Sequence, residues 1–277
     1  MGLRISTNVA SINAQRNLGV AQHLLANAQA RLSSGFRINK AADDAAGLAI
    51  SENLKAQIRG LRQASRNAND GISMVQTAEG GLQEISNILI RFRELSVQAS
   101  SDTIGDKERG FLDVEYQQLK SELQRVSEVT RFNGRDLLNG TGGMFSIQVG
   151  VYNDDFKDRI TFNSSAADST LEALGLSAHN LASKESAQVS IAAADDAIVS
   201  VNSIRANFGA MQNRLQSTVN NLGVSDENLS AANSRVRDTD VAAETSDMVR
   251  NNILLQAGVS VLTQANAVQQ VALKLLG

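Results

Sequence analysis

The chain has 277 residues, a net charge of −3 and no cysteine, proline or tryptophan, and aromatic residues make up 4% of it. The missing cysteines exclude disulfides and thiolate metal sites, and the slightly acidic balance argues against binding nucleic acid or an anionic membrane. Because proline breaks helices and aromatic side chains supply much of a compact core, this composition favours long helices packed side by side.

The amino end carries a helical pattern with few charges, whose apolar members are Ile5, Val9, Ile12, Leu18, Val20, Leu24, Leu25 and Leu32. The first residues lack the apolar core of roughly 7 to 15 residues that marks a secretory signal, and no later run approaches the ~18 apolar residues of a membrane span. We therefore expect no membrane insertion. The protein is expected either to stay in the cytoplasm or to be exported by a pathway that does not require a cleavable signal peptide.

A seven-residue spacing of apolar residues then holds from Asn53 to Gln98, through Leu54, Leu61, Ala68, Val75, Leu82 and Leu89. It predicts a packed helix of roughly 50 residues. The pattern allows a kink near Gly80, because each glycine in a helix interior destabilises the helix by about 1 kcal/mol relative to alanine. A shorter stripe from Leu112 to Val126 predicts a second helix, antiparallel to the first.

The middle of the chain contains the only β-pattern. The segments MFSIQVG (144–150) and DRITFN (158–163) alternate apolar with polar residues around the loop YNDDF, which predicts two strands. The helical period returns from Ala187 to Leu222. Gly223 marks a predicted C-cap or short break, and Ser225 is the predicted N-cap of a further helix.

The carboxyl end repeats the pattern of the amino end, since Lys274 is the only charged residue from Asn251 onward. On a helical wheel its large apolar residues share one broad face, worth roughly 10 to 20 kcal/mol of gross transfer free energy if buried. One interpretation is ordinary amphipathic helices buried within one domain. We favour a self-association surface, formed by Ile5, Val9, Ile12, Leu18, Leu24 and Leu25 at one end and by Leu254, Leu255, Val261, Leu262, Val268, Leu275 and Leu276 at the other.

Four stretches at the two ends resemble bacterial flagellin, the subunit of the flagellar filament. They are NVASINAQRNL (8–18), LSSGFRINKAADDAAGLAIS (32–51), NLSAANSRVRDTDVAAET (228–245) and ILLQAGVSVLTQAN (253–266). The resemblance covers about residues 1–140 and 185–277. Only about 50 residues, 130–184, separate the helical arms, so the sequence looks like a minimal flagellin without the large variable outer domains.

The resemblance implies a mainly α fold, a long antiparallel helical bundle or coiled coil with a small β-hairpin region at about 130–184. Residues 1–43 and 230–277 would form the inner filament core, and residues 44–229 the rod around it. It further implies export in an unfolded state through the flagellar type III apparatus without a cleaved signal peptide. An export chaperone, a filament cap, copies of the same chain and other flagellins would be its partners, in an extracellular filament used for swimming.

The family resemblance also implies recognition of the monomer by a vertebrate Toll-like receptor through the stretch LIRFRELSVQ (89–98). The matching positions in this sequence are Arg91, Leu95 and Glu115. From the residues alone, the stretch is a solvated helix face beside the core positions Leu89 and Phe92.

No pattern in the sequence supports catalysis, a cofactor or a metal. Asp43 and Asp44 are expected to mark a helix start rather than an acid–base pair, and the two histidines, His23 and His179, stand apart. The signatures HExxH and GxSxG are absent. The alternatives to a filament subunit are a hook-filament junction protein of the same superfamily, a cytoplasmic coiled-coil adaptor and, as a distant third, an enzyme.

Overall fold

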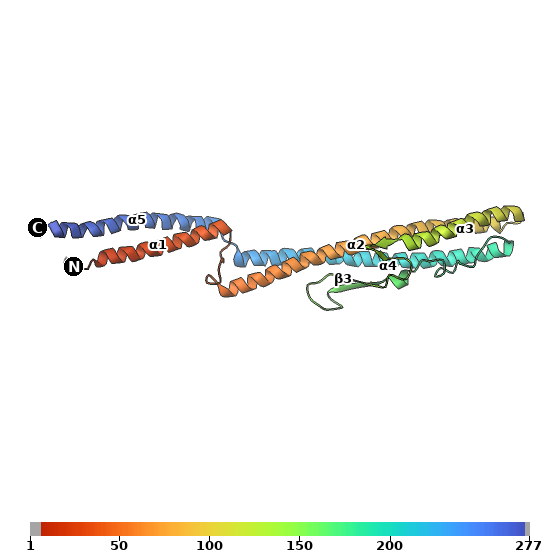
Figure 1. Cartoon of the computed structure of the whole chain (residues 1–277), viewed down its shortest axis with the longest axis horizontal. Coiled ribbons are helices and arrows are strands. Elements are labelled where there is room, and N and C mark those ends of the chain that lie inside the picture. Colours follow the sequence, from red (N-terminus) through yellow and green to blue (C-terminus); the bar gives the residue numbers. More distant parts are fainter. Residues whose placement is uncertain (1–6, 275–277) are drawn as a thin grey trace. The chain divides into compact units, whose positions relative to one another are not determined.

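The computed structural model describes the backbone of residues 7–274 and side chains as far as Ala267. Helices dominate this part of the chain (Figure 1), which confirms the predicted mainly α fold. The helices are α1 (Val9–Ser34), α2 (Ala45–Ala99), α3 (Asp106–Val129), α4 (Lys184–Arg237) and α5 (Val241–Lys274). Between α3 and α4 lie β1 (Arg131–Phe132), β2 (Arg135–Asp136), β3 (Met144–Gln148), β4 (Arg159–Asn163) and the 3-10 turn η1 (Ser164–Ala167).

The chain folds into two compact units. One comprises the two ends of the chain, up to Ala56 and from Asn228, and the other comprises residues 57–227. We call them the terminal unit and the central unit. The predicted division into 1–43 with 230–277 and 44–229 concerns the assembled filament and stays a prediction.

The core of the central unit lies between α2, α3 and α4. Ala68, Val75, Leu82 and Leu89, four of the predicted heptad residues, are completely buried. Three contacts show that α2 and α3 are antiparallel, since residue numbers rise along one helix as they fall along the other. Arg109 Nε donates to Ala99 O at 2.9 Å, the rings of Tyr116 and Phe92 lie 4.5 Å apart, and Thr130 packs beside Gly81.

The predicted break at Gly223 and the predicted N-cap at Ser225 are wrong, because α4 continues through both residues to Arg237. α2 likewise runs through Gly80 as a single helix. The apolar period persists across these sites, so core packing outweighs a glycine cost of about 1 kcal/mol. The break after α4 comes at Asp238–Asp240, where the Asp240 carboxylate accepts hydrogen bonds from the first turn of α5.

The predicted strands form a hairpin on the helical core. β3 and β4 pair antiparallel, with Phe145 opposite Phe162 and Ile147 opposite Ile160. The Phe162 ring lies 4.9 Å from the ring of Phe208 on α4. This contact joins the hairpin to α4, as expected for a sheet with one buried face.

Glycines of α2 mark where the middle segment approaches the helix most closely. A Cβ added at Gly60 would lie 2.6 Å from Val151 Cγ1, and one at Gly71 would lie 2.6 Å from Ile147 Cδ1. At Gly81 it would lie 2.5 Å from Thr130 Oγ1 and 2.9 Å from Leu138 Cδ1. These glycines therefore leave room for the hairpin and its flanking loop to pack against the helix.

Gly80→Ala and Gly81→Ala are expected to change stability in opposite directions. Gly80 has open space around its Cα, so alanine there should stabilise the central unit by up to about 1 kcal/mol through helix propensity. At Gly81 the new methyl meets the β-branched Thr130 and the buried Leu138, which should destabilise by about 1 to 3 kcal/mol. Urea unfolding followed by circular dichroism measures both effects. Equal unfolding midpoints for the two variants would contradict a close contact of Gly81 with Thr130 and Leu138.

Candidate functional site

The terminal unit is built on a pair of antiparallel helices, α1 and α5. Asn8 caps α1 by accepting a hydrogen bond from Ser11 N at 3.0 Å, and its amide donates to Ala265 O of α5 at 2.9 Å. Near the other end of α1, Arg31 forms an ion pair with Glu244 at 3.6 Å. The two contacts fix the register of the helices over most of their length.

Small residues form the seam between α1 and α5. Ala14, Ala21 and Ala28 recur every seven residues on α1 and are all buried. On α5, a Cβ added at Gly258 would lie 3.2 Å from Leu18 Cδ1. The seam also half-buries four residues predicted for self-association, which are Leu18, Leu25, Leu255 and Leu262. Part of the predicted surface is therefore already used within the subunit.

A second group of apolar residues on α1 points away from the seam. Val9, Ile12 and Leu24 of the predicted set, together with Val20, are 47 to 58% exposed. On a wheel of about 100° per residue these four lie within about 120° of each other, and their mean direction is about 115° from that of Ala14, Ala21 and Ala28. We call them the α1 stripe.

Exposed apolar residues on α5 are spread more widely around the helix. Leu254 and Val261 of the predicted set are 52% and 56% exposed. Sequence analysis missed Val249, Ile253 and Val259, which are 48 to 60% exposed and fall outside the predicted face. The predicted single broad face is thus divided between the seam and solvent. Ile5, Leu275, Leu276 and the side chain of Val268 lie outside the described residues.

Backbone contacts join the turn after α1 to the turn after α4. Gly35 adopts a positive φ of 75°, which ends α1. Its carbonyl accepts from Thr239 N at 3.0 Å, and Arg37 N donates to Arg237 O at 2.7 Å. The Arg237 guanidinium pairs with Glu52, and this hydrogen bond lowers the pKa of the Glu52 carboxyl. The terminal unit is therefore held together at both helix breaks.

The acids at the start of α2 cap backbone groups. The Asp43 carboxylate accepts hydrogen bonds from Lys40 N and Asn39 N, which lower its pKa. Asp44 accepts from Gly47 N at 2.8 Å. Both have a local structural role, as predicted for a helix start.

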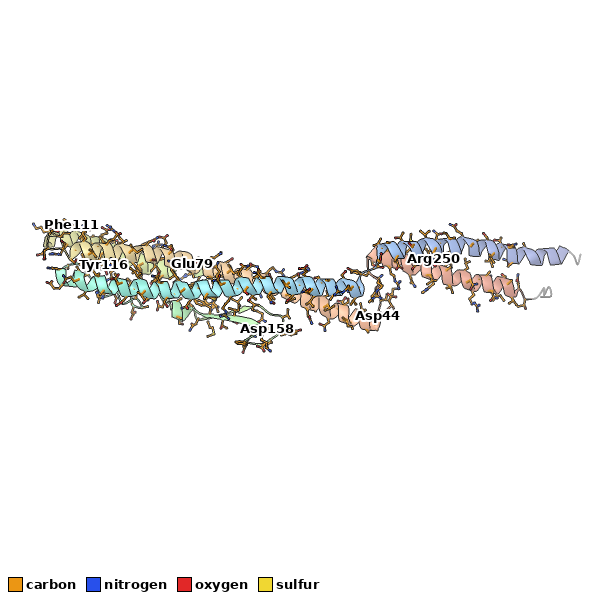
Figure 2. The ribbon with its side chains drawn as sticks, turned by 180° about the vertical axis from the view of Figure 1, so that it is seen from behind. Asp44, Glu79, Phe111, Tyr116, Asp158 and Arg250 are labelled. Atoms are coloured by element: carbon orange, nitrogen blue, oxygen red, sulfur yellow. The ribbon has the colours of Figure 1, made fainter. Side chains whose placement is uncertain are left out.

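The predicted recognition residues divide into an exposed pair and a buried neighbour. Arg91 Nε donates to Glu115 Oε1 at 2.8 Å, and Arg91 Nη1 contacts Glu94 at 3.0 Å. These two carboxylates raise the pKa of the Arg91 guanidinium, Glu115 most strongly. Leu95 is completely buried in the core that also contains Tyr116, so it does not share the exposure of the pair. Figure 2 labels Tyr116 on α3.

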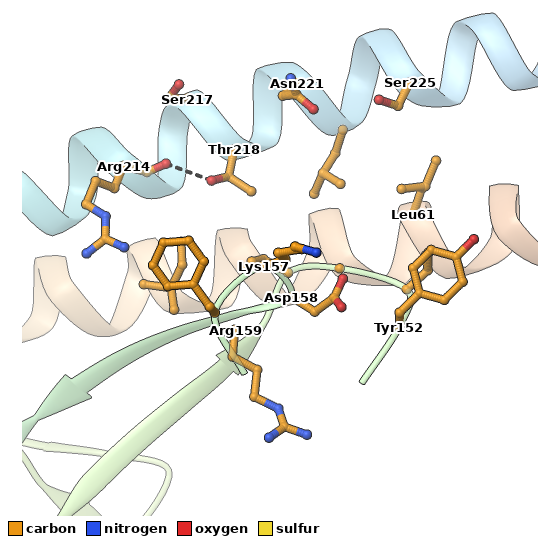
Figure 3. A pocket seen from close by; sticks show the side chains of 16 residues that line it. Leu61, Tyr152, Lys157, Asp158, Arg159, Arg214, Ser217, Thr218, Asn221 and Ser225 are labelled. Atoms are coloured by element: carbon orange, nitrogen blue, oxygen red, sulfur yellow. Dashed lines mark hydrogen bonds between the residues drawn. The ribbon is translucent and has the colours of Figure 1, made fainter. Parts of the chain in front are cut away.

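A cavity of about 610 Å³ opens between the turn of the β3–β4 hairpin and α4 in the central unit (Figure 3). Leu61 and Leu222 contribute apolar surface, while Ser217, Thr218 and Asn221 supply polar groups. Asp158, at its edge, is 7% exposed and accepts from Asp154 N at 3.1 Å.

The described part of the chain contains neither a cluster of metal ligands nor a helix that could span a membrane. Within it, no three His, Cys, Asp or Glu side chains gather as metal ligands would. None of its helices combines the length and apolar character that crossing a bilayer requires. His23 lies 3.2 Å from the Asn27 amide, and the carbonyl of His179 accepts from Lys120 Nζ, so the two histidines have separate local contacts.

Comparisons with known proteins agree over almost the whole chain. Residues 5–142 match the model of the bacterial flagellin N-terminal helical region, and residues 191–276 match that of the C-terminal helical region. A flagellin of Halalkalibacterium halodurans is 44% identical over 98% of this chain and 99% of its own length. The flagellar filament 30.7 kDa core protein of Treponema maltophilum is 40% identical with the same coverage of both chains. The crystal structure of Bacillus cereus flagellin aligns with a TM-score of 0.51 at 34% identity, over 57% of this chain and 88% of that one.

Proposed function

This chain belongs to the bacterial flagellin family and is a structural subunit of the flagellar filament, and we propose that it assembles through the exposed apolar residues of α1 and α5. The observation that supports these surfaces is the α1 stripe, whose four side chains remain about half exposed although α1 packs against α5. No observation favours a junction protein or a cytoplasmic adaptor.

The α1 stripe has enough apolar surface to drive association. Each of its four side chains is worth about 1.5 to 3 kcal/mol when fully transferred from water. Since they are about half exposed, covering them gives roughly 3 to 6 kcal/mol of gross stabilisation per subunit. The exposed residues of α5 add to this, and contacts between different surfaces of successive copies produce an open helical polymer.

The terminal unit is proposed to form the inner part of the filament. Residues 1–43 and 230–277 would line its core, and residues 44–229 would surround them. The weakly charged surface of α5 suits that position, because it would contact other helices rather than bulk solvent. The role is structural, and we propose no catalytic activity.

Family membership also supports the proposals about export and location. The filament is extracellular, and we propose that this chain reaches it through the flagellar export apparatus without losing a signal peptide. An export chaperone, a filament cap and other flagellins are its proposed partners.

The exposed Arg91–Glu115 pair supports a proposal about the free monomer. A vertebrate Toll-like receptor would contact this pair, while Leu95 would keep α2 and α3 in place beneath it. A receptor-reporter assay with purified monomer tests the proposal, and a silent reporter would refute it.

Seeded growth tests the assembly proposal. Purified protein mixed with short filament seeds should lengthen them, as seen by negative-stain electron microscopy. Protein lacking residues 252–277 should not, because most of α5 is removed. Filaments that grow equally well from the truncated protein would exclude α5 as an assembly surface.

A further inference from the structure

The β1–β2 hairpin carries an Asn-Gly pair in an exposed tight turn. Phe132 pairs with Arg135, so Asn133 and Gly134 are the two residues of the turn. Both have a positive φ, 49° and 77°, as the favoured two-residue hairpin turn requires. Both are exposed, and neither the Asn133 carboxamide nor the Gly134 N–H has a hydrogen-bond partner in the part of the chain that the structure describes.

A second Asn-Gly pair, Asn139 and Gly140, is held by hydrogen bonds. Asn139 Nδ2 donates to Asp136 Oδ2 at 2.8 Å, and its Oδ1 accepts from Thr141 N at 3.0 Å and from Thr141 Oγ1 at 2.7 Å. Gly140 packs closely, since a Cβ added there would lie 2.7 Å from Asp168 Oδ2. The same dipeptide therefore occurs twice in one segment, once with a free side-chain amide and once with a fixed one.

Asparagine followed by glycine can lose its side-chain amide without an enzyme. The deprotonated backbone nitrogen of Gly134 attacks Asn133 Cγ, the new N–Cγ bond forms, and the Cγ–Nδ2 bond breaks. The leaving nitrogen takes up a proton and departs as ammonia. Water then opens the cyclic imide, either at Cγ to give aspartate or at the backbone carbonyl carbon to give isoaspartate. Glycine favours the attack because it has no Cβ to shield its nitrogen.

We propose that Asn133 is a site of spontaneous deamidation in the folded chain and that Asn139 is protected. The turn has to open for the Gly134 nitrogen to reach the Asn133 side chain, and a hairpin of two residue pairs opens easily. Arg131 and Arg135 flank the turn, and their positive charges favour the anionic nitrogen. At Asn139, by contrast, three hydrogen bonds must break first.

Deamidation would change both the charge and the backbone of the turn. A carboxylate at position 133 adds a negative charge, and the isoaspartyl product adds a CH₂ group to the main chain. The turn leads directly to Leu137 and Leu138, which are completely buried, and Thr130 before it packs beside Gly81. A longer turn should therefore loosen this segment on α2, so the isoaspartyl chain should unfold at a lower urea concentration than the fresh chain. An unchanged midpoint would contradict this consequence.

Peptide mapping by mass spectrometry tests the site itself. The full chain is incubated as a monomer at mildly alkaline pH, and deamidation is followed from the mass increase of the amide-to-acid conversion. Asn133 should convert at least about tenfold faster than Asn139, because only Asn139 is held by hydrogen bonds. A protein isoaspartyl methyltransferase should methylate the peptide that contains position 133. In urea that unfolds the chain, both sites should convert at similar rates.

Two variants separate the chemistry from the protection. Gly134→Ala should slow conversion at Asn133 even in urea, where the fold of the variant has no influence, because the methyl group shields the nitrogen. Thr141→Val removes the hydroxyl hydrogen bond to Asn139 and should speed conversion there by about 2- to 10-fold, with no change at Asn133. An unchanged rate at Asn139 would contradict its protection by hydrogen bonds.

Two outcomes in the unmodified chain would overturn the inference. One is equal conversion rates for Asn133 and Asn139 in the folded monomer, and the other is conversion of Asn133 only after unfolding in urea. Both are measured without filament seeds, so they leave the proposed function to be judged by seeded growth alone.

Discussion

Val261→Asp is expected to abolish filament growth while leaving the subunit folded. Val261 is 56% exposed, so a carboxylate there remains hydrated in the monomer and should cost little. In the filament the same carboxylate would be buried without a partner, which costs several kcal/mol. A loss of about 3 kcal/mol per subunit raises the concentration needed for assembly by more than about 100-fold. Seeded growth and sedimentation measure the loss, and circular dichroism checks that the helices remain.

Two aspartate variants separate assembly from folding. Val199→Asp puts the same charge on an exposed valine of the central unit, outside the contact proposed for the terminal helices, and should leave growth unchanged. Leu262→Asp places the charge in the seam with α1, so it should reduce the helix content of the terminal unit as well as block assembly. Normal filament growth of the Val261→Asp protein would show that Val261 does not lie in the assembly interface.

The sequence predicts the central helices well because their burial follows one period. Positions from Ala68 to Leu89 recur every seven residues, and a helix that packs along one side buries those positions. α5 does not provide such a signal, because its apolar residues surround much of the helix. The side that meets α1 is decided by small residues such as Ala21 and Gly258, which allow close approach. Large residues alone therefore misidentified part of the seam as free surface.

The contacts of the hairpin were beyond sequence analysis for a different reason. Alternation predicted both strands, since it reports local burial. Their position against α2 depends on pairs such as Gly71 and Ile147, which are far apart in the chain and form only in the folded core. From the sequence alone, the same glycines only indicate positions where a helix is less stable.

Phe208→Ala is expected to detach the hairpin from α4 and to destabilise the central unit strongly. Phe208 is 1% exposed, and its ring contacts that of Phe162 on β4, which in turn lies 6.2 Å from the ring of Phe145 on β3. Removing the ring leaves a cavity in this row of aromatic side chains, with an expected loss of about 3 to 5 kcal/mol. Urea unfolding of the monomer, followed by far-UV circular dichroism, measures it.

Phe156→Ala provides the matched control, because it removes the same side chain from the turn of the same hairpin. Phe156 is 92% exposed in the monomer, so its loss should change the unfolding free energy by less than about 0.5 kcal/mol. Equal stability losses for the two variants would mean that the hairpin is not held by the Phe162–Phe208 contact.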